Sequence, residues 1–363
     1  MKMRVVGRLV LREAHVAVEA KDFGAMRLAG GLRKILGEEI GQEFGRFADL
    51  VAVEILVRLV EFLRVVGLQP LEKADRAGDH LGETVGHGAG PSGTADGGRI
   101  AEDRNGRCGA MRFSANLGFL WTELSLPDAI RAAKAAGFDA VECHWPYDTD
   151  GAQVRAALAE SDLPMVALNT RPGDRGLGEF GLAALPDREA EARAAIVEAL
   201  GYARAVGAGA VHVMSGIAEG PEARDTFVKN LCFACAEASD LTILIEPINR
   251  VDVPGYFLGS VEQALELLDG LGAENLRLMA DCYHIAQMGL DVVATLERLL
   301  PVTGHVQIAG HPGRGAPDTG RLDYGTVLAT LERLGWEGFI GAEYRPDGPT
   351  EASLGWLERQ VLP

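Results

Sequence analysis

From Met111 onward, short apolar or β-branched runs alternate with longer stretches rich in Ala, Leu and Glu. A short run that is apolar throughout is typical of a strand buried in a parallel sheet, whereas apolar residues three and four positions apart are typical of a helix. This alternation occurs eight times. The predicted strands are residues 112–117 (RFSANL), 140–145 (AVECHW), 165–170 (MVALNT), 210–215 (AVHVMS), 242–247 (TILIEP), 276–281 (LRLMAD), 304–309 (GHVQIA) and 338–344 (GFIGAEY).

The stretches between these runs include three clear helices, predicted over residues 126–137, 188–207 and 260–272. Each of them ends in Gly, which is frequent just past the last turn of a helix. Eight strand–helix units within about 250 residues have the size and the order of a (β/α)₈ barrel. We therefore predict an α/β protein in which eight parallel strands close into a barrel.

Residues 1–110 do not follow the alternation. They contain 16 basic and 16 acidic side chains, so residues 111–363 carry the whole formal charge of −17. Residues 78–109 are rich in Gly and poor in apolar side chains, a composition that buries too little surface to offset chain entropy. We predict a partly disordered N-terminal extension over 1–110 and a barrel domain over 111–360. Whether the extension is a native module or translation begins at Met111 stays open, and we expect a chain that starts at Met111 to fold and keep its activity.

The composition excludes several classes of protein. A chain with 52 acidic and 35 basic residues has no basic surface to hold a phosphate backbone, which argues against nucleic acid as a partner. No apolar run approaches the roughly 18 residues that a membrane span requires, and charges at Arg8, Arg12 and Glu13 interrupt any signal peptide. Five cysteines without framework spacing indicate reduced thiols. We expect a cytoplasmic protein.

Polar side chains gather at the ends of the predicted strands. They are Asn116, Glu142, His144, Asn169, His212, Glu246, Asp281, Gln307 and Glu343. In a (β/α)₈ barrel the chemistry lies at the carboxyl ends of the strands, and a carboxylate inside a buried strand is costly unless it meets a metal, a partner or a substrate. We therefore expect these side chains to share one centre.

Four of them, on the last four strands, form a set suited to a divalent cation. Glu246, Asp281 and Glu343 offer carboxylates and Gln307 offers an amide oxygen. Hard oxygen ligands favour Mg²⁺ or Mn²⁺ over zinc, and three anions without a cation would raise one another's pKa. The alternative is a polar barrel mouth that holds no ion.

The remaining candidate residues give weaker evidence for a functional role. Cys232 and Cys235 form a CxxC within a helical stretch that has no second pair, so we expect no metal or redox role. His305 opens a predicted strand at the opposite face and is expected to be structural. The Gly-punctuated loops at 216–222 and 311–315 lack the patterns that cradle a nucleotide, and no nucleotide cofactor is indicated.

Several motifs together resemble the hydroxypyruvate isomerase family, which belongs to the xylose-isomerase-like TIM barrels of sugar isomerases and epimerases. The resemblance covers residues 112 to about 358. Its motifs are RFSANL, PYD (146–148), the run from Asn169 through PGD (172–174), IEPIN (245–249) followed by VPGY, DCYH (281–284), HVQIAGHPGRGAPDTG (305–320) and GAEYRP (341–346).

The resemblance implies roles for individual residues. Glu246 and Glu343 would be the acid/base pair and would also bind the metal, with Asp281 and Gln307 completing its shell. The resemblance further implies that four residues bind the substrate. They are His284, Asp252, Arg314 and Asn169. It also implies a homodimer, as barrels of this class pair through their outer helices.

The implied reaction is the interconversion of hydroxypyruvate and 2-hydroxy-3-oxopropanoate (tartronate semialdehyde), an aldose–ketose type isomerisation through an enediolate. A sister activity on four-carbon 2-oxo-tetronates is the first alternative. A metal-dependent nuclease would need more His ligands and a basic face, and a non-catalytic sugar-acid binding protein would need no carboxylate pair. If the substrate is a 2-oxo acid, Arg314 is the expected partner of its carboxylate; otherwise Arg314 is an exposed loop residue.

Overall fold

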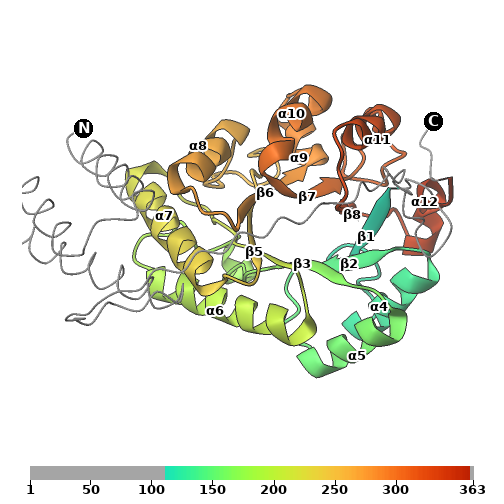
Figure 1. The fold of residues 1–363 in the computed structure, drawn as a ribbon, viewed down its shortest axis with the longest axis horizontal. Coiled ribbons are helices and arrows are strands. Elements are labelled where there is room, and N and C mark those ends of the chain that lie inside the picture. The colour runs from blue at the N-terminus through green and yellow to red at the C-terminus, as the bar shows by residue number, and fades with distance from the viewer. Residues whose placement is uncertain (1–110, 360–363) are drawn as a thin grey trace, which may run out of the picture. The chain divides into compact units, whose positions relative to one another are not determined.

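The computed structural model describes residues 111–359, so the predictions made for residues 1–110 lie outside the described residues. All eight predicted strands are present and form a closed parallel barrel in chain order, with β8 paired to β1 (Figure 1). The strands are β1 (Arg112–Asn116), β2 (Ala140–Cys143), β3 (Met165–Asn169), β4 (Ala210–His212), β5 (Thr242–Ile245), β6 (Leu276–Asp281), β7 (Thr303–Ile308) and β8 (Phe339–Ala342).

Helices follow the strands and pack on the outside of the barrel (Figure 1). They are α4 (Leu126–Ala135), α5 (Gly151–Ser161), α6 (Glu189–Val206), α7 (Gly220–Glu237), α8 (Val261–Leu271), α9 (Cys282–Gln287), α10 (Val292–Leu299), α11 (Tyr324–Arg333) and α12 (Gly355–Arg359), with 3₁₀ turns η2 (Arg175–Leu177), η3 (Leu300–Val302) and η4 (Thr350–Ser353). The predicted Gly after α6 is Gly207, whose φ of 78° is left-handed. No helix in this part of the chain is long and apolar enough to cross a membrane.

Several strands end earlier than the sequence predicts. β2 ends at Cys143, β5 at Ile245 and β8 at Ala342, so His144, Glu246 and Glu343 each lie one residue beyond a strand. The consequence is that these three side chains belong to the mouth of the barrel.

Part of the barrel interior below the mouth is apolar. Ala167, Ala210, Leu244 and Met279, from four neighbouring strands, form a buried cluster of their own. Each lies two residues before a strand-end polar residue and so points to the same side of its strand. These side chains form a dry floor beneath the polar groups.

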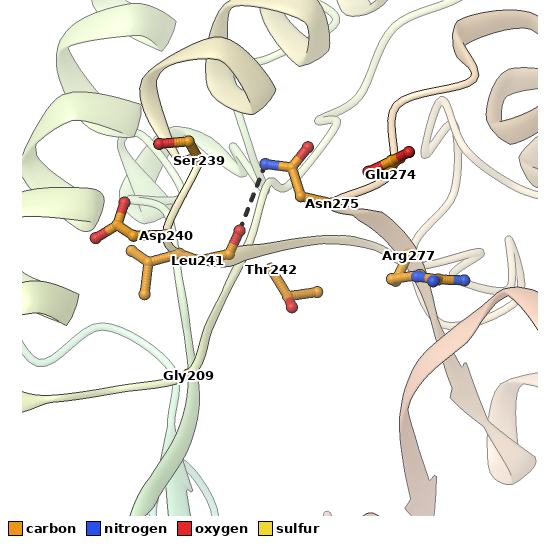
Figure 2. A pocket seen from close by; sticks show the side chains of 8 residues that line it. All are labelled: Gly209, Ser239, Asp240, Leu241, Thr242, Glu274, Asn275 and Arg277. Carbon is orange, nitrogen blue, oxygen red and sulfur yellow. Dashed lines mark hydrogen bonds between the residues drawn. The ribbon is translucent and has the colours of Figure 1, made fainter. Parts of the chain in front are cut away.

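The opposite, amino end of the barrel carries a shallow depression between the starts of β4, β5 and β6 (Figure 2). Its lining residues are Gly209, Ser239, Asp240, Leu241, Thr242, Glu274, Asn275 and Arg277. Asn275 donates its amide hydrogens to the carbonyls of Cys235, Ala238 and Leu241 at 3.1, 2.8 and 3.4 Å, which caps the end of α7. The depression contains none of the residues predicted for a site.

Candidate active site

The strand-end residues meet at one level of the barrel because neighbouring strands are in register there. Asn116 is paired with Glu142, Asn169 with His212, and Asp281 with Gln307. Parallel strands place their carboxyl ends at one edge. The predicted shared centre is therefore present at this end.

Arg314 links two of the three predicted carboxylate ligands. Its Nη2 donates to Asp281 Oδ2 at 2.9 Å and to Glu343 Oε2 at 2.5 Å. The guanidinium also stacks over the rings of Phe119 and Tyr283, 5.2 and 5.0 Å from their centres. Only 12% of the Arg314 side chain is exposed, so the interpretation as an exposed loop residue is wrong.

Burial and charge act differently on the three carboxyl groups. Burial raises the pKa of Glu246 well above its ordinary value, and the charge of Glu343 raises it further. Burial also raises the pKa of Asp281 to about 7, although Arg314 opposes the shift. Burial acts on Glu343 in the same direction, but Arg314 and the hydrogen bond from His144 outweigh it and leave the pKa below its ordinary value.

Gln307 has its amide orientation fixed by a buried carboxylate. Its Nε2 donates to Glu142 Oε1 at 2.8 Å, and because a carboxylate only accepts, the Oε1 of Gln307 must face away from Glu142. Glu142 accepts three further hydrogen bonds, from Ser114 Oγ, Asn116 Nδ2 and His305 Nε2. Gly341 leaves the necessary space, since a Cβ there would lie 2.6 and 2.7 Å from the two Glu142 oxygens.

Several buried atoms of the strand-end residues have no hydrogen-bond partner among the described residues. They are Glu246 Oε1, Gln307 Oε1 and both ring nitrogens of His212. Buried polar atoms are normally paired, and exceptions often mark a bound ion, water or ligand. Two unpaired oxygens of a carboxylate and an amide fit a hard divalent cation.

A compact group of ligand atoms supports the same conclusion. Glu246, Asp281 and His284 each offer an atom within 4.8 Å of the others, and all three are buried. This triad overlaps the predicted metal set in its two carboxylates, while His284 was predicted to contact substrate. The described residues therefore include a cluster able to hold a metal ion.

The other predicted substrate residues lie at different depths. Asp252 is exposed in the loop after β5 and accepts a hydrogen bond from Asn249 Nδ2 at 3.0 Å. Asn169 ends β3, is half-buried, and accepts the Tyr147 hydroxyl at its carbonyl. His305 lies inside the barrel as the third residue of β7, where it bonds Glu142, rather than at the strand's start.

Four strand-end polar residues of the site have no role assigned from the sequence. They are Asn116, Glu142, His144 and His212. Asn116 donates to both Glu142 and Glu343, at 3.0 and 3.1 Å. His144 Nε2 lies 2.8 Å from Glu343 Oε1, and Gly118 leaves room for its ring. His212 lies with Nδ1 3.7 Å from Glu246 Oε2, and burial lowers its pKa to about 4. Their position at strand ends was the signal that could have assigned them.

Comparison with known proteins places the barrel among related enzymes. The xylose isomerase-like TIM-barrel family matches residues 130–360. A 2-oxo-tetronate isomerase of Cupriavidus necator is 44% identical over 253 residues, which covers 68% of this chain and 97% of that protein. The hydroxypyruvate isomerase of Escherichia coli K12 is 36% identical over 254 residues, covering 68% of this chain and 98% of that protein.

A solved structure from Brucella melitensis, described as an AP endonuclease of family 2, is 36% identical. It covers 69% of this chain and 98% of its own, with a TM-score of 0.66.

Proposed function

Because this chain belongs to the xylose isomerase-like TIM-barrel family, we propose that it is an isomerase that interconverts hydroxypyruvate and 2-hydroxy-3-oxopropanoate. The observation that carries the proposal is the ring of buried carboxylates at the carboxyl ends of the strands, with Glu246 Oε1 and Gln307 Oε1 unpaired. A buried site of this kind is built for a ligand that brings its own charge.

The residues that would hold a divalent cation, Mg²⁺ or Mn²⁺, are Glu246, Asp281, Gln307 and Glu343. When bound, such a cation supplies Lewis-acid stabilisation of the negative charge that develops on the substrate oxygens. The fixed amide of Gln307 presents an oxygen to this centre, and the carboxylates supply the anionic ligands. Burial keeps competing water away from all four.

The proton transfer falls to Glu246 and Glu343. One carboxylate removes a proton from C3 of hydroxypyruvate. The electron pair of that bond forms the C2–C3 double bond of an enediolate, and the C2 carbonyl pair moves onto its oxygen. A carboxylic acid then returns a proton to C2, while the C3 hydroxyl passes its proton to the C2 oxygen, so that C3 becomes the aldehyde and C2 carries the hydroxyl. No oxidant is needed, and a positioned acid or base of this kind contributes about 10²- to 10⁴-fold.

Arg314 provides the positive charge for the carboxylate of the substrate. A guanidinium can hold a carboxylate through two parallel hydrogen bonds, and the two aromatic rings keep this one in place. His284, Asn169 and Asp252 are proposed to contact the remaining oxygens. The alternative substrate, a four-carbon 2-oxo-tetronate, would use the same groups, and one relative carries that name.

The test is an assay of the full chain, with and without added Mg²⁺ or Mn²⁺, on hydroxypyruvate, 2-oxo-tetronate and abasic DNA in parallel. We expect metal-dependent conversion of hydroxypyruvate that is abolished by chelation. Greater turnover of the four-carbon acid would move the assignment to the sister activity. Cleavage of abasic DNA without isomerisation would contradict the proposal.

A further inference from the structure

Asn249, at the end of the IEPIN motif, has its side-chain amide held in one orientation. Its Oδ1 accepts the backbone N–H groups of Val251 and Asp252 at 3.1 and 2.9 Å. Its Nδ2 donates to Asp252 Oδ2 at 3.0 Å. Three independent partners therefore agree on which end of the amide carries the hydrogens.

The same Nδ2 lies 2.6 Å from Nδ1 of His284, and the backbone N–H of Asn249 points at that nitrogen from 3.4 Å. Two donors facing one ring nitrogen require a lone pair on it. A hydrogen on Nδ1 would meet an N–H at this distance, which excludes both the cationic imidazole and the Nδ1–H tautomer. The hydrogen of the neutral ring must therefore be on Nε2.

The Nε2–H of His284 faces the centre of the site. The nearest group is Nη1 of Arg314 at 3.2 Å, which is also a donor and cannot accept. The carboxylate oxygens of Asp281 and Glu246 are farther away, at 3.6 and 3.7 Å. The Arg314 N–H is directed at Nε2 itself, so two donors face each other here, and no described oxygen lies within hydrogen-bonding distance of Nε2 to separate them.

We propose that Asn249 is a positioning residue that locks His284 as an Nε2–H donor, so that His284 and Arg314 together bind one anionic oxygen of the substrate. The proposal rests on the proposed function for the identity of that oxygen, which belongs to the carboxylate or the enediolate of a 2-oxo acid. Preorganised donors aimed at a developing charge are among the strongest catalytic devices. A locked Nε2–H also makes His284 a donor to substrate rather than a metal ligand, although its nitrogen lies within the triad.

The experiment reads the tautomer directly by ¹⁵N NMR of the histidine side chains in the full chain, labelled on histidine. The His284 signals are identified by their loss in His284→Gln. In the wild type we expect the Nε2–H pattern. An Nδ1–H pattern would overturn the proposal whether or not the chain is an isomerase, so the two failures can be told apart.

In the double variant Asn249→Asp/Asp252→Asn, the group that faces His284 Nδ1 changes from a donor to an acceptor, while the net charge is kept. A carboxylate at 249 accepts from Nδ1–H, so we expect the tautomer to switch and the KM for hydroxypyruvate to rise about 10- to 100-fold, the loss of a hydrogen bond to a charged group. Asp252→Asn alone retains the amide of Asn249 and should keep the Nε2–H pattern. A switched tautomer with unchanged KM would remove the donor pair from substrate binding, and if the double variant does not fold, the wild-type spectrum decides.

Discussion

The two ends of the barrel treat their polar groups in opposite ways. At the amino end, the amide of Asn275 donates to three carbonyls, and Figure 2 draws the bond to Leu241. Exposed Asp240, in the same depression, is paired with Arg204 through two hydrogen bonds of 2.6 and 3.0 Å. At the carboxyl end, buried Glu246 and Gln307 each keep an oxygen with no partner in the described part of the chain.

The difference indicates that the polar groups of the amino-end depression stabilise the fold, whereas those at the carboxyl end are arranged to bind a ligand. An unpaired polar atom in a buried site costs about 1–3 kcal/mol, and the fold carries several of them at the mouth alone. In the amino-end depression, Asn275 and Asp240 find their partners within the chain. At the carboxyl end it leaves groups whose partners must come from a bound molecule or ion.

The largest contrast between the ends should come from removing one charge at each. Glu246→Gln and Glu343→Gln should each keep the fold and lower turnover of hydroxypyruvate by about 10²- to 10⁴-fold. Glu274→Gln, on the exposed rim of the amino-end depression, should leave turnover unchanged. Steady-state rates measure this, with circular dichroism as the check on folding. Near wild-type turnover of either site variant would demote that Glu to a polar core residue.

A smaller effect, on metal affinity, is expected when the hydrogen bond that orients the proposed metal ligand Gln307 is disturbed. Gly341→Ala places a Cβ 2.9 Å from Gln307 Cγ and closer still to Glu142, so the amide of Gln307 should lose its fixed orientation. Calorimetric titration with Mn²⁺ should show an affinity about 10- to 100-fold weaker, the usual cost of losing such a support.

The matched control for this change is Gly270→Ala. Gly270 lies exposed near the end of α8, and a Cβ there meets nothing within 4 Å. It should raise stability by about 0.5–1 kcal/mol through helix propensity and leave Mn²⁺ affinity alone. Equal Mn²⁺ affinities of the two variants would separate Glu142 and Gln307 from the metal site.

Arg314→Ala tests whether the mouth is built for an acid. The KM for hydroxypyruvate should rise about 10- to 100-fold because a charge-assisted hydrogen bond is lost. The KM for dihydroxyacetone, an uncharged ketose with the same reacting carbons, should change little. Removing Arg314 also removes its hydrogen bonds to Asp281 and Glu343, and any resulting loss of kcat should affect both substrates equally. The measurement is therefore the ratio of the two KM values. An unchanged ratio would reopen a neutral sugar as substrate.

The smallest predicted effect is on the pH dependence of stability. Burial raises the pKa of Asp281 to about 7, above its unfolded value of roughly 3.9. The Asp281 carboxyl therefore contributes stability to the ligand-free fold that is lost as pH rises between these values, because the unfolded chain gives up the proton first. Glu142 and Glu343 have lowered pKa values and stay ionised in both states above about pH 5, so they do not oppose this contribution. Buried His212, with its pKa lowered to about 4, acts in the opposite direction, since its contribution to stability grows as pH rises from about 4 to its ordinary value of about 6.5.

Metal binding requires the carboxylates without their protons. The rise in melting temperature caused by Mg²⁺ should consequently grow between pH 5 and pH 8. Thermal denaturation at matched ionic strength measures it. A rise that is the same at both pH values would mean that the ion does not bind at Asp281.

The strands and the level of the site were predictable from the sequence because both depend on local periodicity. Each buried strand is recognisable as an apolar run, and a carboxylate at the end of such a run, as at Glu246 and Asp281, is easily identified. The (β/α)₈ topology then brings those ends together without further information.

The contacts that set the chemistry were not predictable, because they join residues far apart in the chain. Arg314 reaches back to Asp281, 33 positions earlier, and Gln307 is oriented by Glu142, 165 positions earlier. The bond that holds His305 inside the barrel was missed for the same reason: the sequence predicts His305 at the opposite face, and its partner Glu142 lies 163 positions earlier, on another strand. Periodicity gives the direction of a side chain but not the partner across a barrel.

The most direct test of the account is proton exchange at carbon. The full chain is incubated with hydroxypyruvate and Mg²⁺ in D₂O, and the C3 hydrogens and the product are followed by NMR for the wild type, Glu246→Gln, Glu343→Gln and Glu274→Gln. We expect fast conversion by the wild type and by Glu274→Gln. The variant that lacks the base should neither exchange nor convert, while the variant that lacks the returning acid should exchange C3 without forming product. Exchange and conversion at the wild-type rate in both site variants would contradict the account.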